Sequence, residues 1–578
     1  MKQGHRDSLS KMKQAMSARD FDAAAQIGRK LIRKYPERTD FQLMTSVSEL
    51  QGSYLSQGGL RLIRLLKAVE RNDRHIGMIF QNLMAFARAT SDYSSVIDAA
   101  EHKHRAHSSE PLYAEFLARL IVEDHARHAV GRCHSDRILQ AIKLLEGIPG
   151  SFERFADVRM LLASLYVDCE MTEQAFALLD DMVLSDPHNS ELREFQISVW
   201  AIFGKVDQAV SASLDLIARQ ANVSARPYLT IAFLRPFAMP DGAETRLKDI
   251  FASQEISARD RYNAGFTLAR IYESRHQMAE AFEWYRSTHD ANRQEMPFDI
   301  SAEQAEINKI AVLSVQQNDV LVDMRKEHSG PKPIFVLGMP RSGTTLAERI
   351  LGAHSAVYAA GEIGDFAFII ASVVGPGSIS EQMARLDNKA ILDIRKQYLA
   401  AMGAYAPDAR YVTNKTPANF LRLGLIRRVF PDSPIIHCER HPLATCLSIY
   451  TTPFGRPMRF SDDLQDMADY YRGYQNLMSV FEETDSNHQI FNLNYEDLVA
   501  SPDHVARAFL MHCGLSWEPQ CLEFYRDSRA SQTASLMQVR RPINSESVDK
   551  WQRFEPFIGP LATLSERIEK KTKATFAA

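Results

Sequence analysis

The chain has 578 residues, of which 45% are hydrophobic and 24% are charged. This composition is ordinary for a globular protein, and the length exceeds what a single hydrophobic core supports, so two or three domains are expected. The formal net charge of −4 argues against a nucleic-acid-binding protein, which usually carries a surplus of basic residues. Any site for an anion must therefore be a local cluster of arginine and lysine.

The six cysteines are scattered without the spacing of metal ligands, which is typical of small buried residues in a reducing compartment. No apolar segment of the signal-peptide kind follows the N-terminus. The longest apolar run, Phe366 to Val374, is shorter than the ~20 residues that a helix needs to span a bilayer. We expect a cytoplasmic protein without a membrane span.

Residues 1–325 place apolar side chains at i, i+3, i+4 and i+7 with few strand signals, which predicts helix after helix. Ala175 and Ala209 lie 34 positions apart in similar sequence frames, and Pro187 follows the first by twelve positions. This pattern indicates a tetratricopeptide-like solenoid, in which small residues stand where paired helices touch and a proline ends the second helix. An irregular helical domain is the alternative. Solenoid surfaces commonly bind peptides or join copies of a chain.

A Gly/Pro-rich connector, Ser329-Gly-Pro-Lys-Pro333, introduces a different pattern. Short Val/Ile/Phe-rich runs then alternate with helical segments, which predicts a doubly wound parallel sheet with ligands at the carboxyl ends of its strands. We therefore expect a helical-repeat domain at residues 1–325 and an α/β domain at residues 326–578. The expected strands lie at 333–338, near 356–360, and at 410–414, 434–439 and 489–494.

A glycine-bracketed turn follows the first strand, in Pro333-Ile-Phe-Val-Leu-Gly-Met-Pro-Arg-Ser-Gly-Thr-Thr-Leu346. Gly338 and Gly343 allow the backbone amides between them to wrap an anion, and the next helix directs its N-terminal dipole at the same point. The ATP-binding pattern requires lysine where Thr344 stands, whereas the cation here is Arg341, inside the turn. This P-loop-like turn suits a less highly charged group than a triphosphate, such as a phosphosulfate.

The segment Pro340-Arg-Ser-Gly-Thr-Thr-Leu346 resembles the 5′-phosphosulfate loop of sulfotransferases that use 3′-phosphoadenosine-5′-phosphosulfate (PAPS). The resemblance is greatest to tyrosylprotein sulfotransferases and to bacterial tetratricopeptide-repeat sulfotransferases, and it covers residues 333–556. It implies that Arg341 acts in catalysis as well as in binding. The loop positions that it assigns to the donor are Pro340, Arg341, Ser342, Gly343, Thr344 and Thr345.

Arg440 and Ser448 follow the fourth expected strand, in Ser433-Pro-Ile-Ile-His-Cys-Glu-Arg-His-Pro-Leu-Ala-Thr-Cys-Leu-Ser-Ile-Tyr450. The resemblance implies that this pair holds the 3′-phosphate of the donor, and a planar guanidinium can give a phosphate two hydrogen bonds. Taken alone, such an arginine is more often a salt-bridge residue and such a serine is more often solvated. His441 stands where relatives more often carry an acidic residue.

Two residues are candidates for the chemical step. Glu362, in Val357-Tyr-Ala-Ala-Gly-Glu-Ile-Gly364, resembles the catalytic base of the tyrosylprotein branch. Lys415, in Arg410-Tyr-Val-Thr-Asn-Lys-Thr-Pro417, resembles the lysine at the oxygen that bridges phosphate and sulfate, although Asn414 replaces a common Asp. A hydroxyl must lose a proton while charge grows on the departing phosphate, so a base and a fixed cation both suit the reaction. Without the resemblance, Glu362 could equally stabilise a helix N-terminus, and Lys415 could be solubilising.

A segment near the C-terminus, Gln538-Val-Arg-Arg-Pro-Ile-Asn-Ser-Glu-Ser-Val-Asp-Lys-Trp551, resembles the closing segment of the family, which reaches back to the phosphates of the donor. We expect Trp551 and Phe554 to anchor it by packing, and Asn494-Tyr-Glu-Asp-Leu498 to be structural. The positions that match donor-binding residues are Arg540, Ser547 and Lys550.

These features predict a sulfotransferase that moves a sulfuryl group from PAPS to a hydroxyl, or less readily to an amine, and releases 3′,5′-bisphosphoadenosine (PAP). Because the helical region is larger than a small phenol requires, the expected acceptor is a polypeptide tyrosine or a polysaccharide. No His, Cys and carboxylate cluster in the sequence calls for a metal. The repeats could instead bind a protein partner or drive self-association. The alternative functions are a P-loop kinase or nucleotidase, and a repeat adaptor that binds nucleotide without turnover.

Overall fold

The computed structural model describes residues 3–70, 73–90, 92–128, 136–152, 154–220, 223–316, 330–454, 456–485, 488–526 and 540–564. They form two compact units, of which the first ends at Tyr166 and the second begins at Val167. The change of unit thus falls inside the helical region, and the second unit contains both helices and the sheet. The predicted domain boundary between residues 325 and 326 lies outside the described residues.

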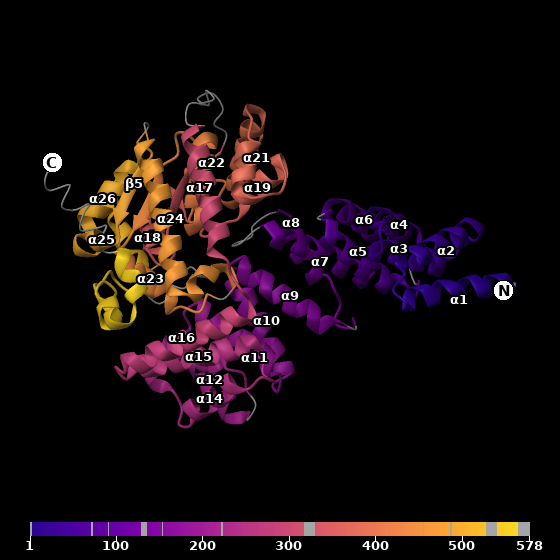
Figure 1. Ribbon diagram of the computed structural model, residues 1–578, viewed down its shortest axis with the longest axis horizontal. Coiled ribbons are helices and arrows are strands. Elements are labelled where there is room, and N and C mark those ends of the chain that lie inside the picture. Colours follow the sequence, from indigo (N-terminus) through magenta and orange to yellow (C-terminus); the bar gives the residue numbers. More distant parts are fainter. Residues whose placement is uncertain are drawn as a thin grey trace. The chain divides into compact units, whose positions relative to one another are not determined.

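The first unit is built from successive helices that pack on their neighbours in the chain, such as α1 on α2 and α7 on α8 (Figure 1). Asp20 caps α2 by accepting a hydrogen bond from the amide of Ala23, and Pro36 lies just beyond its end. The helices are α1 (Gln3–Ser17), α2 (Phe21–Lys34), α3 (Thr39–Gln51), α4 (Leu55–Ala68), α5 (Ile76–Thr90), α6 (Tyr93–Ala106), α7 (Pro111–His128), α8 (Asp136–Glu146) and most of α9 (Phe155–Asp168).

Helices continue in the second unit, where α15 and α16 lie side by side (Figure 1). The alanines that mark the repeat pattern, Ala175, Ala209 and Ala281, are completely buried, which confirms that small residues stand where helices meet. The described residues up to 316 therefore form an all-α array of helical repeats. Its further elements are α10 (Thr172–Ser185), α11 (Ser190–Ile202), α12 (Val206–Arg219), α13 (Arg226–Leu234), η1 (Pro236–Ala238), α14 (Ala243–Ala252), α15 (Ala258–Ser274), α16 (Met278–Glu295) and α17 (Ile300–Gln316).

A five-stranded sheet follows, in which every neighbouring pair is parallel and the order is β2-β3-β1-β4-β5. The strands confirm the predicted positions and the doubly wound fold class. Because β1 lies between β3 and β4, the chain leaves it toward opposite sides of the sheet, and a ligand site is expected at that switch point. The strands are β1 (Lys332–Gly338), β2 (Val357–Tyr358), β3 (Tyr411–Asn414), β4 (Ile435–Glu439) and β5 (Ile490–Asn494).

Alternate side chains of β1 enter two different cores, as expected for a strand that is covered on both faces. Phe335 and Leu337 pack into one cluster, whereas Ile334 and Val336 pack into the other. Helices α19 (Asp365–Val374), α21 (Asn388–Tyr405), α22 (Leu423–Val429) and α24 (Leu464–Glu483) contribute to the first cluster. Helices α18 (Thr344–Gly352) and α26 (Pro502–His512) contribute to the second.

The remaining elements connect these layers and form the C-terminal part of the described chain. They are α20 (Ile379–Ala384), η2 (Pro417–Arg422), α23 (Pro442–Tyr450), η3 (Arg456–Asp462), α25 (Tyr495–Ala500), η4 (Pro519–Arg526), η6 (Lys550–Phe557) and η7 (Gly559–Leu564).

The last repeat helices share the hydrophobic core of the sheet. Tyr285 of α16 and Ile307 of α17 belong to the same buried cluster as Phe335 of β1. In the same region His289 is buried, with Nδ1 2.9 Å from Asp462 Oδ1 and Nε2 2.9 Å from the carbonyl oxygen of Tyr450. Both ring nitrogens are thereby satisfied, as burial of a polar group requires. Helices α16 and α17 are thus an integral part of the second unit.

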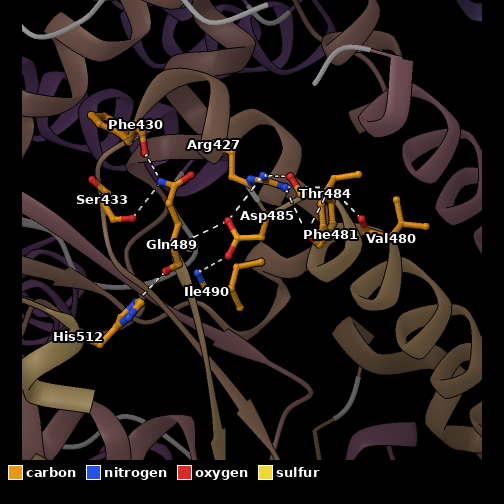
Figure 2. A network of polar contacts seen from close by, with 10 residues as sticks. All are labelled: Arg427, Phe430, Ser433, Val480, Phe481, Thr484, Asp485, Gln489, Ile490 and His512. Carbon is orange, nitrogen blue, oxygen red and sulfur yellow. Dashed lines mark hydrogen bonds and ion pairs between the residues drawn. The ribbon is translucent and has the colours of Figure 1, made fainter. Parts of the chain in front are cut away.

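A polar network fixes the amino-terminal ends of β4 and β5, the edge opposite to the carboxyl ends of the strands (Figure 2). Asp485 accepts hydrogen bonds from the amides of Gln489 and Ile490, and Arg427 lies 3.7 Å from its carboxylate. The ring of His512 is 2.9 Å from the carbonyl oxygen of Gln489. Because these groups satisfy one another, we assign them a structural role.

The five cysteines within the described residues are all buried, as expected for small core residues, and Cys133 lies outside those residues. None of the helices in the described part of the chain combines the length and the hydropathy needed to cross a bilayer.

Candidate active site

The turn between β1 and α18 has a backbone that few residues tolerate. Arg341 has a φ of 69° and Gly343 a φ of 101°, and a non-glycine residue in the left-handed region is uncommon outside functional sites. A Cβ atom on Gly343 would lie 2.8 Å from the ring of Tyr495, and one on Gly338 would overlap the carbonyl oxygen of Cys438. Both glycines are therefore required by close packing, and the predicted loop is present.

The loop ends at the N-terminus of α18, which begins at Thr344. Thr344 and Thr345 are buried, and Pro340 precedes the turn. Ser342 is 2% exposed, and its Oγ has no hydrogen-bond partner within the described residues. A buried hydroxyl without a partner is costly, so this atom is suited to meet a ligand.

Two arginines that follow different strands, β1 and β4, meet at this loop. Arg341 Nε donates to Ser448 Oγ at 3.0 Å, and Arg440 Nη1 donates to the carbonyl oxygen of Arg341 at 3.1 Å. Arg440 also donates to the carbonyl oxygen of Ser547 and lies over the ring of Tyr495 at 4.9 Å. Burial, with Arg440 close by, lowers the pKa of Arg341 to about 10. An anion bound between the two guanidinium groups would offset both the burial of Arg341 and the repulsion between the two positive charges.

A cavity of about 430 Å³ opens beside this pair. Within the described residues its lining holds five cationic side chains and no carboxylate. Such a volume is in the range of small-molecule sites, and the charge selects an anion. The cations are Arg226, Arg270, Arg341, Arg440 and Lys550.

A second cavity of about 250 Å³ adjoins the first, since Arg341, Arg440 and Ser547 line both. Gly343 of the loop and Tyr495 contribute to its wall. The structure therefore brings the predicted residues of the loop, of the end of β4 and of the closing segment around one connected region.

Glu362 and Lys415 form a separate pair at the end of β3, which neighbours β1 in the sheet. Lys415 Nζ donates to Glu362 Oε1 at 2.6 Å. The side chain of Lys415 is 1% exposed and that of Glu362 is 38% exposed, so the carboxylate is open to solvent whereas the ammonium is buried. Neither residue lines the two cavities.

The backbone that carries Glu362 is held by a buried carboxylate that no sequence pattern singled out. Glu348 of α18 accepts hydrogen bonds from the amide of Gly361 at 2.8 Å and from Thr413 Oγ1 at 2.7 Å. Lys415 donates its own amide hydrogen to the carbonyl oxygen of Gly361 at 2.9 Å. Glu348 thus links the phosphate-loop helix to the segment that presents Glu362, and acts as a positioning residue.

Comparison with known proteins agrees with this geometry. A family model described as "Sulfotransferase family" matches residues 333–519. Residues 333–519 are therefore similar in sequence to this family. An uncharacterized protein of Aquifex aeolicus is 31% identical over 56% of this chain and 44% of its own length. Protein-tyrosine sulfotransferase 2 of Gallus gallus is 25% identical over 38% of this chain and 62% of its own length.

The chain therefore spans less than two thirds of the length of these relatives. Among solved structures, the sulfotransferase domain of the Synechococcus PCC 7002 olefin synthase matches with 20% identity and a TM-score of 0.30, covering 40% of this chain and 90% of that one. Sulfotransferase STF1 from Mycobacterium tuberculosis matches with 15% identity and a TM-score of 0.24, covering 54% and 97%.

Two departures from the sulfotransferase pattern have structural explanations. Asn414 is buried, donates to the hydroxyl of Tyr398 at 2.9 Å and accepts from Asn419 at 3.0 Å, a combination that an ionised Asp could not provide. His441 stacks on Trp551 at 4.8 Å between ring centroids. These residues therefore support the site without weakening the sulfotransferase assignment.

Only some residues of the closing segment near the C-terminus line the cavities. Lys550 lines the larger cavity, and its Nζ lies 2.6 Å from Glu273 Oε1 of α15. Arg540 donates to the carbonyl oxygen of Ile202 at the end of α11, at 3.4 Å, and lines neither cavity. Its neighbour Arg541 lines the smaller cavity instead. Phe554 is completely buried and Trp551 is packed against His441, which confirms their predicted anchoring role.

Besides Glu348 and Arg541, three residues of the site were not predicted from the sequence. Tyr495 belongs to a segment that was expected to be only structural, yet its ring lies against Gly343 and under Arg440. Its position directly after β5, beside β4, was the signal that could have identified it. Arg226 and Arg270 come from repeat helices, and no pattern in the sequence connected them with the loop.

A cluster of His437, Glu439 and Glu482 has the spacing of metal ligands. However, His437 Nδ1 lies 2.8 Å from Asn492 Oδ1 and Nε2 is hydrogen bonded to the hydroxyl of Tyr474. Since both ring nitrogens are already engaged, we interpret the cluster as structural.

Proposed function

We propose that this protein transfers a sulfuryl group from PAPS to a hydroxyl of a macromolecular acceptor. The observation that carries the proposal is the cation-lined cavity beside the glycine-bracketed loop, and that loop lies in the segment that matches the sulfotransferase family model. PAPS carries a phosphosulfate at one end and a phosphate at the other, so it needs separate cationic groups in one enclosed space.

The residues present fit this donor. Ser342 Oγ and Arg440 Nε are buried polar atoms without hydrogen-bond partners within the described residues, and both can donate to an anion. The loop amides with Arg341, Thr344 and Thr345 would hold the 5′-phosphosulfate. Arg440 and Ser448 would hold the 3′-phosphate, with Ser547 and Lys550 beside them.

The pair at the end of β3 would carry out the proton transfer. PAPS, when bound, supplies the sulfuryl group that the acceptor oxygen attacks. Glu362 would take the proton of the attacking hydroxyl on its exposed carboxylate. Lys415 would place positive charge beside the oxygen that departs with PAP, where negative charge develops. Arg341 would stabilise the same charge, so the proposal includes no metal.

For the acceptor we propose a polypeptide tyrosine ahead of a polysaccharide. The Gallus gallus relative is named a protein-tyrosine sulfotransferase, and the array of helices up to residue 316 is the kind of surface that binds extended chains. The repeats would then select the acceptor or a protein partner, and self-association through them is the competing role.

The first test is the thermal unfolding midpoint of the full chain with PAP and with ATP–Mg²⁺. We expect PAP to raise it and ATP–Mg²⁺ to have little effect, and the reverse result would favour a kinase or nucleotidase. The second test supplies labelled PAPS with tyrosine peptides, polysaccharides and small phenols. Tight PAP binding without transfer to any acceptor would instead indicate a nucleotide-binding adaptor.

A further inference from the structure

Two of the five cations in the larger cavity belong to the helical repeats rather than to the sulfotransferase segment. Arg226 is the first residue of α13, and Arg270 lies in α15. Thr230 and Phe233 of α13 line the same cavity. The repeat helices therefore form a wall of this site.

Arg270 is held in place by its neighbours. Its Nη1 donates to Glu273 Oε2 at 2.8 Å, and its guanidinium carbon lies 5.0 Å from the ring centroid of Phe233. Its Nε has no hydrogen-bond partner within the described residues. A guanidinium that is fixed by a carboxylate and an aromatic ring, with its buried Nε–H still unpaired, is prepared to bind an anion.

Glu273 connects this arginine to the closing segment. Its carboxylate also accepts from Lys550 Nζ at 2.6 Å and from the hydroxyl of Tyr285 at 3.0 Å. Although burial acts to raise the pKa of Glu273, Arg270 and Lys550 hold it at about 2. The ionised carboxylate therefore fixes one cation from the repeats and one from the sulfotransferase segment side by side.

The cavity still holds more positive than negative charge. Glu273 offsets one of the five cations, Glu194 and Asp260 act on Arg226 beside the cation Arg259, and Glu496 acts on Arg440, so the five cations of the lining are opposed by four carboxylates. Arg440, Ser448 and Lys550 line this cavity, whereas Gly343 of the loop lines the smaller one. The surplus charge thus lies in the cavity that the residues assigned to the 3′-phosphate line together with Arg341 of the loop.

We propose that Arg226 and Arg270 of the helical repeats bind the 3′-phosphate of the donor together with Arg440, Ser448 and Lys550. This inference rests on the proposed function. The repeat region would then complete the donor site, and the discrimination between PAP and 5′-AMP, which lacks the 3′-phosphate, would depend on helices α13 and α15.

The test measures the affinities of PAP and 5′-AMP by calorimetry for the full chain and for Arg226→Met and Arg270→Met. Since hydrogen bonds to a charged group are lost, each substitution should weaken PAP binding by roughly ten- to hundredfold and leave 5′-AMP affinity nearly unchanged. Arg270→Lys should retain part of the affinity, because the charge remains.

Arg275→Met is the matched control, since Arg275 is the C-cap residue of α15 and pairs with Glu244 at a half-exposed position outside both cavities. Arg226→Met keeps the test decisive if Arg270→Met unfolds, because Arg226 makes no contact with Glu273 among the described interactions. Equal losses for PAP and 5′-AMP, or unchanged PAP binding with a raised acceptor KM, would overturn the inference. Failure of the unmodified chain to bind PAP would overturn the proposed function itself.

Discussion

The cation-lined cavity and the Glu362–Lys415 pair lie at neighbouring strand ends but differ in how their charges are balanced. The cavity gathers five cations with no carboxylate among its described lining residues. In the pair, one ammonium faces one carboxylate, and only the carboxylate is open to solvent. A surplus of charge stabilises a bound anion, whereas a matched pair with one exposed member suits proton transfer. Substitutions in the two regions should therefore alter different kinetic constants.

The sharpest separation should come from Glu362→Gln. Loss of the base should lower turnover by roughly 10²–10⁴-fold, the usual contribution of general acid–base catalysis. PAP affinity should be nearly unchanged, because Glu362 lines neither cavity. The measurement is kcat with labelled PAPS, alongside calorimetric titration with PAP.

Glu255→Gln is a suitable control for that variant, because Glu255 is an exposed residue between α14 and α15. Normal turnover in Glu362→Gln would mean that another group is the base. A matching loss of PAP affinity would remove the distinction between the two regions.

On the cavity side, Glu273→Gln should change the pH dependence of stability. The pKa of Glu273 is lowered from 4.5 to about 2, so its contribution is fully present above pH 4.5 and is lost as the pH falls toward 2. That shift corresponds to about 3 kcal/mol. Urea unfolding of the two proteins should give a difference in unfolding free energy that is largest at pH 5 and smaller at pH 3.

Glu283→Gln provides the comparison for this pH series, since Glu283 pairs with Arg286 at the exposed surface of α16. A difference between unmodified protein and Glu273→Gln that stays constant from pH 5 to pH 3 would contradict the low pKa. It would also weaken the view that Glu273 fixes Arg270 and Lys550.

Arg440→Ala should have a smaller and purely binding effect. Removing its hydrogen bonds to a charged group should weaken PAP binding by ~1.5–3 kcal/mol, with kcat at saturating donor close to normal. Arg553→Ala, at an exposed position of η6, is the control. A large fall in kcat with unaltered PAP affinity would place Arg440 on the chemical side of the comparison instead.

The sequence was sufficient for the parts of the site that are local. The strand, the two glycines and Arg341 lie within a few residues, and their spacing alone fixes the turn. Glu362 and Lys415 could be paired only through the family resemblance, yet the parallel order β2-β3-β1 places their segments together as that resemblance implies.

The repeat residues could not be predicted, because packing across distant segments brings them to the site. Arg226 and Arg270 stand in helices whose pattern is that of any solenoid, and a shared core with α16 and α17 brings those helices to the sheet. Arg540 and Arg541 show a second limit of prediction from sequence. They are adjacent in sequence, and only the folded segment shows that the second lines a cavity while the first contacts α11.

The smallest effect on donor binding should follow from removal of residues 1–154, which form most of the first unit. Its buried charges are balanced internally, as Glu49 is by Arg29 and Arg61, whereas Glu273 in the second unit requires Lys550. A chain that starts at Phe155 should therefore bind PAP within roughly 0.5 kcal/mol of the full chain, as expected for independent sites. A chain that starts at residue 326 should lose binding, because it lacks α13, α15 and the core residues of α16 and α17.

The same truncation addresses the acceptor. If the first unit binds an extended polypeptide acceptor, the chain that starts at Phe155 should show unchanged PAP affinity but a lower kcat/KM for that acceptor. Unchanged kcat/KM would mean that residues 1–154 do not select the acceptor, and the polypeptide assignment would then depend on the catalytic half alone. Loss of PAP binding in this chain would show that residues 1–154 contribute to the donor site. That result would contradict the inference drawn from the balanced charges of the first unit.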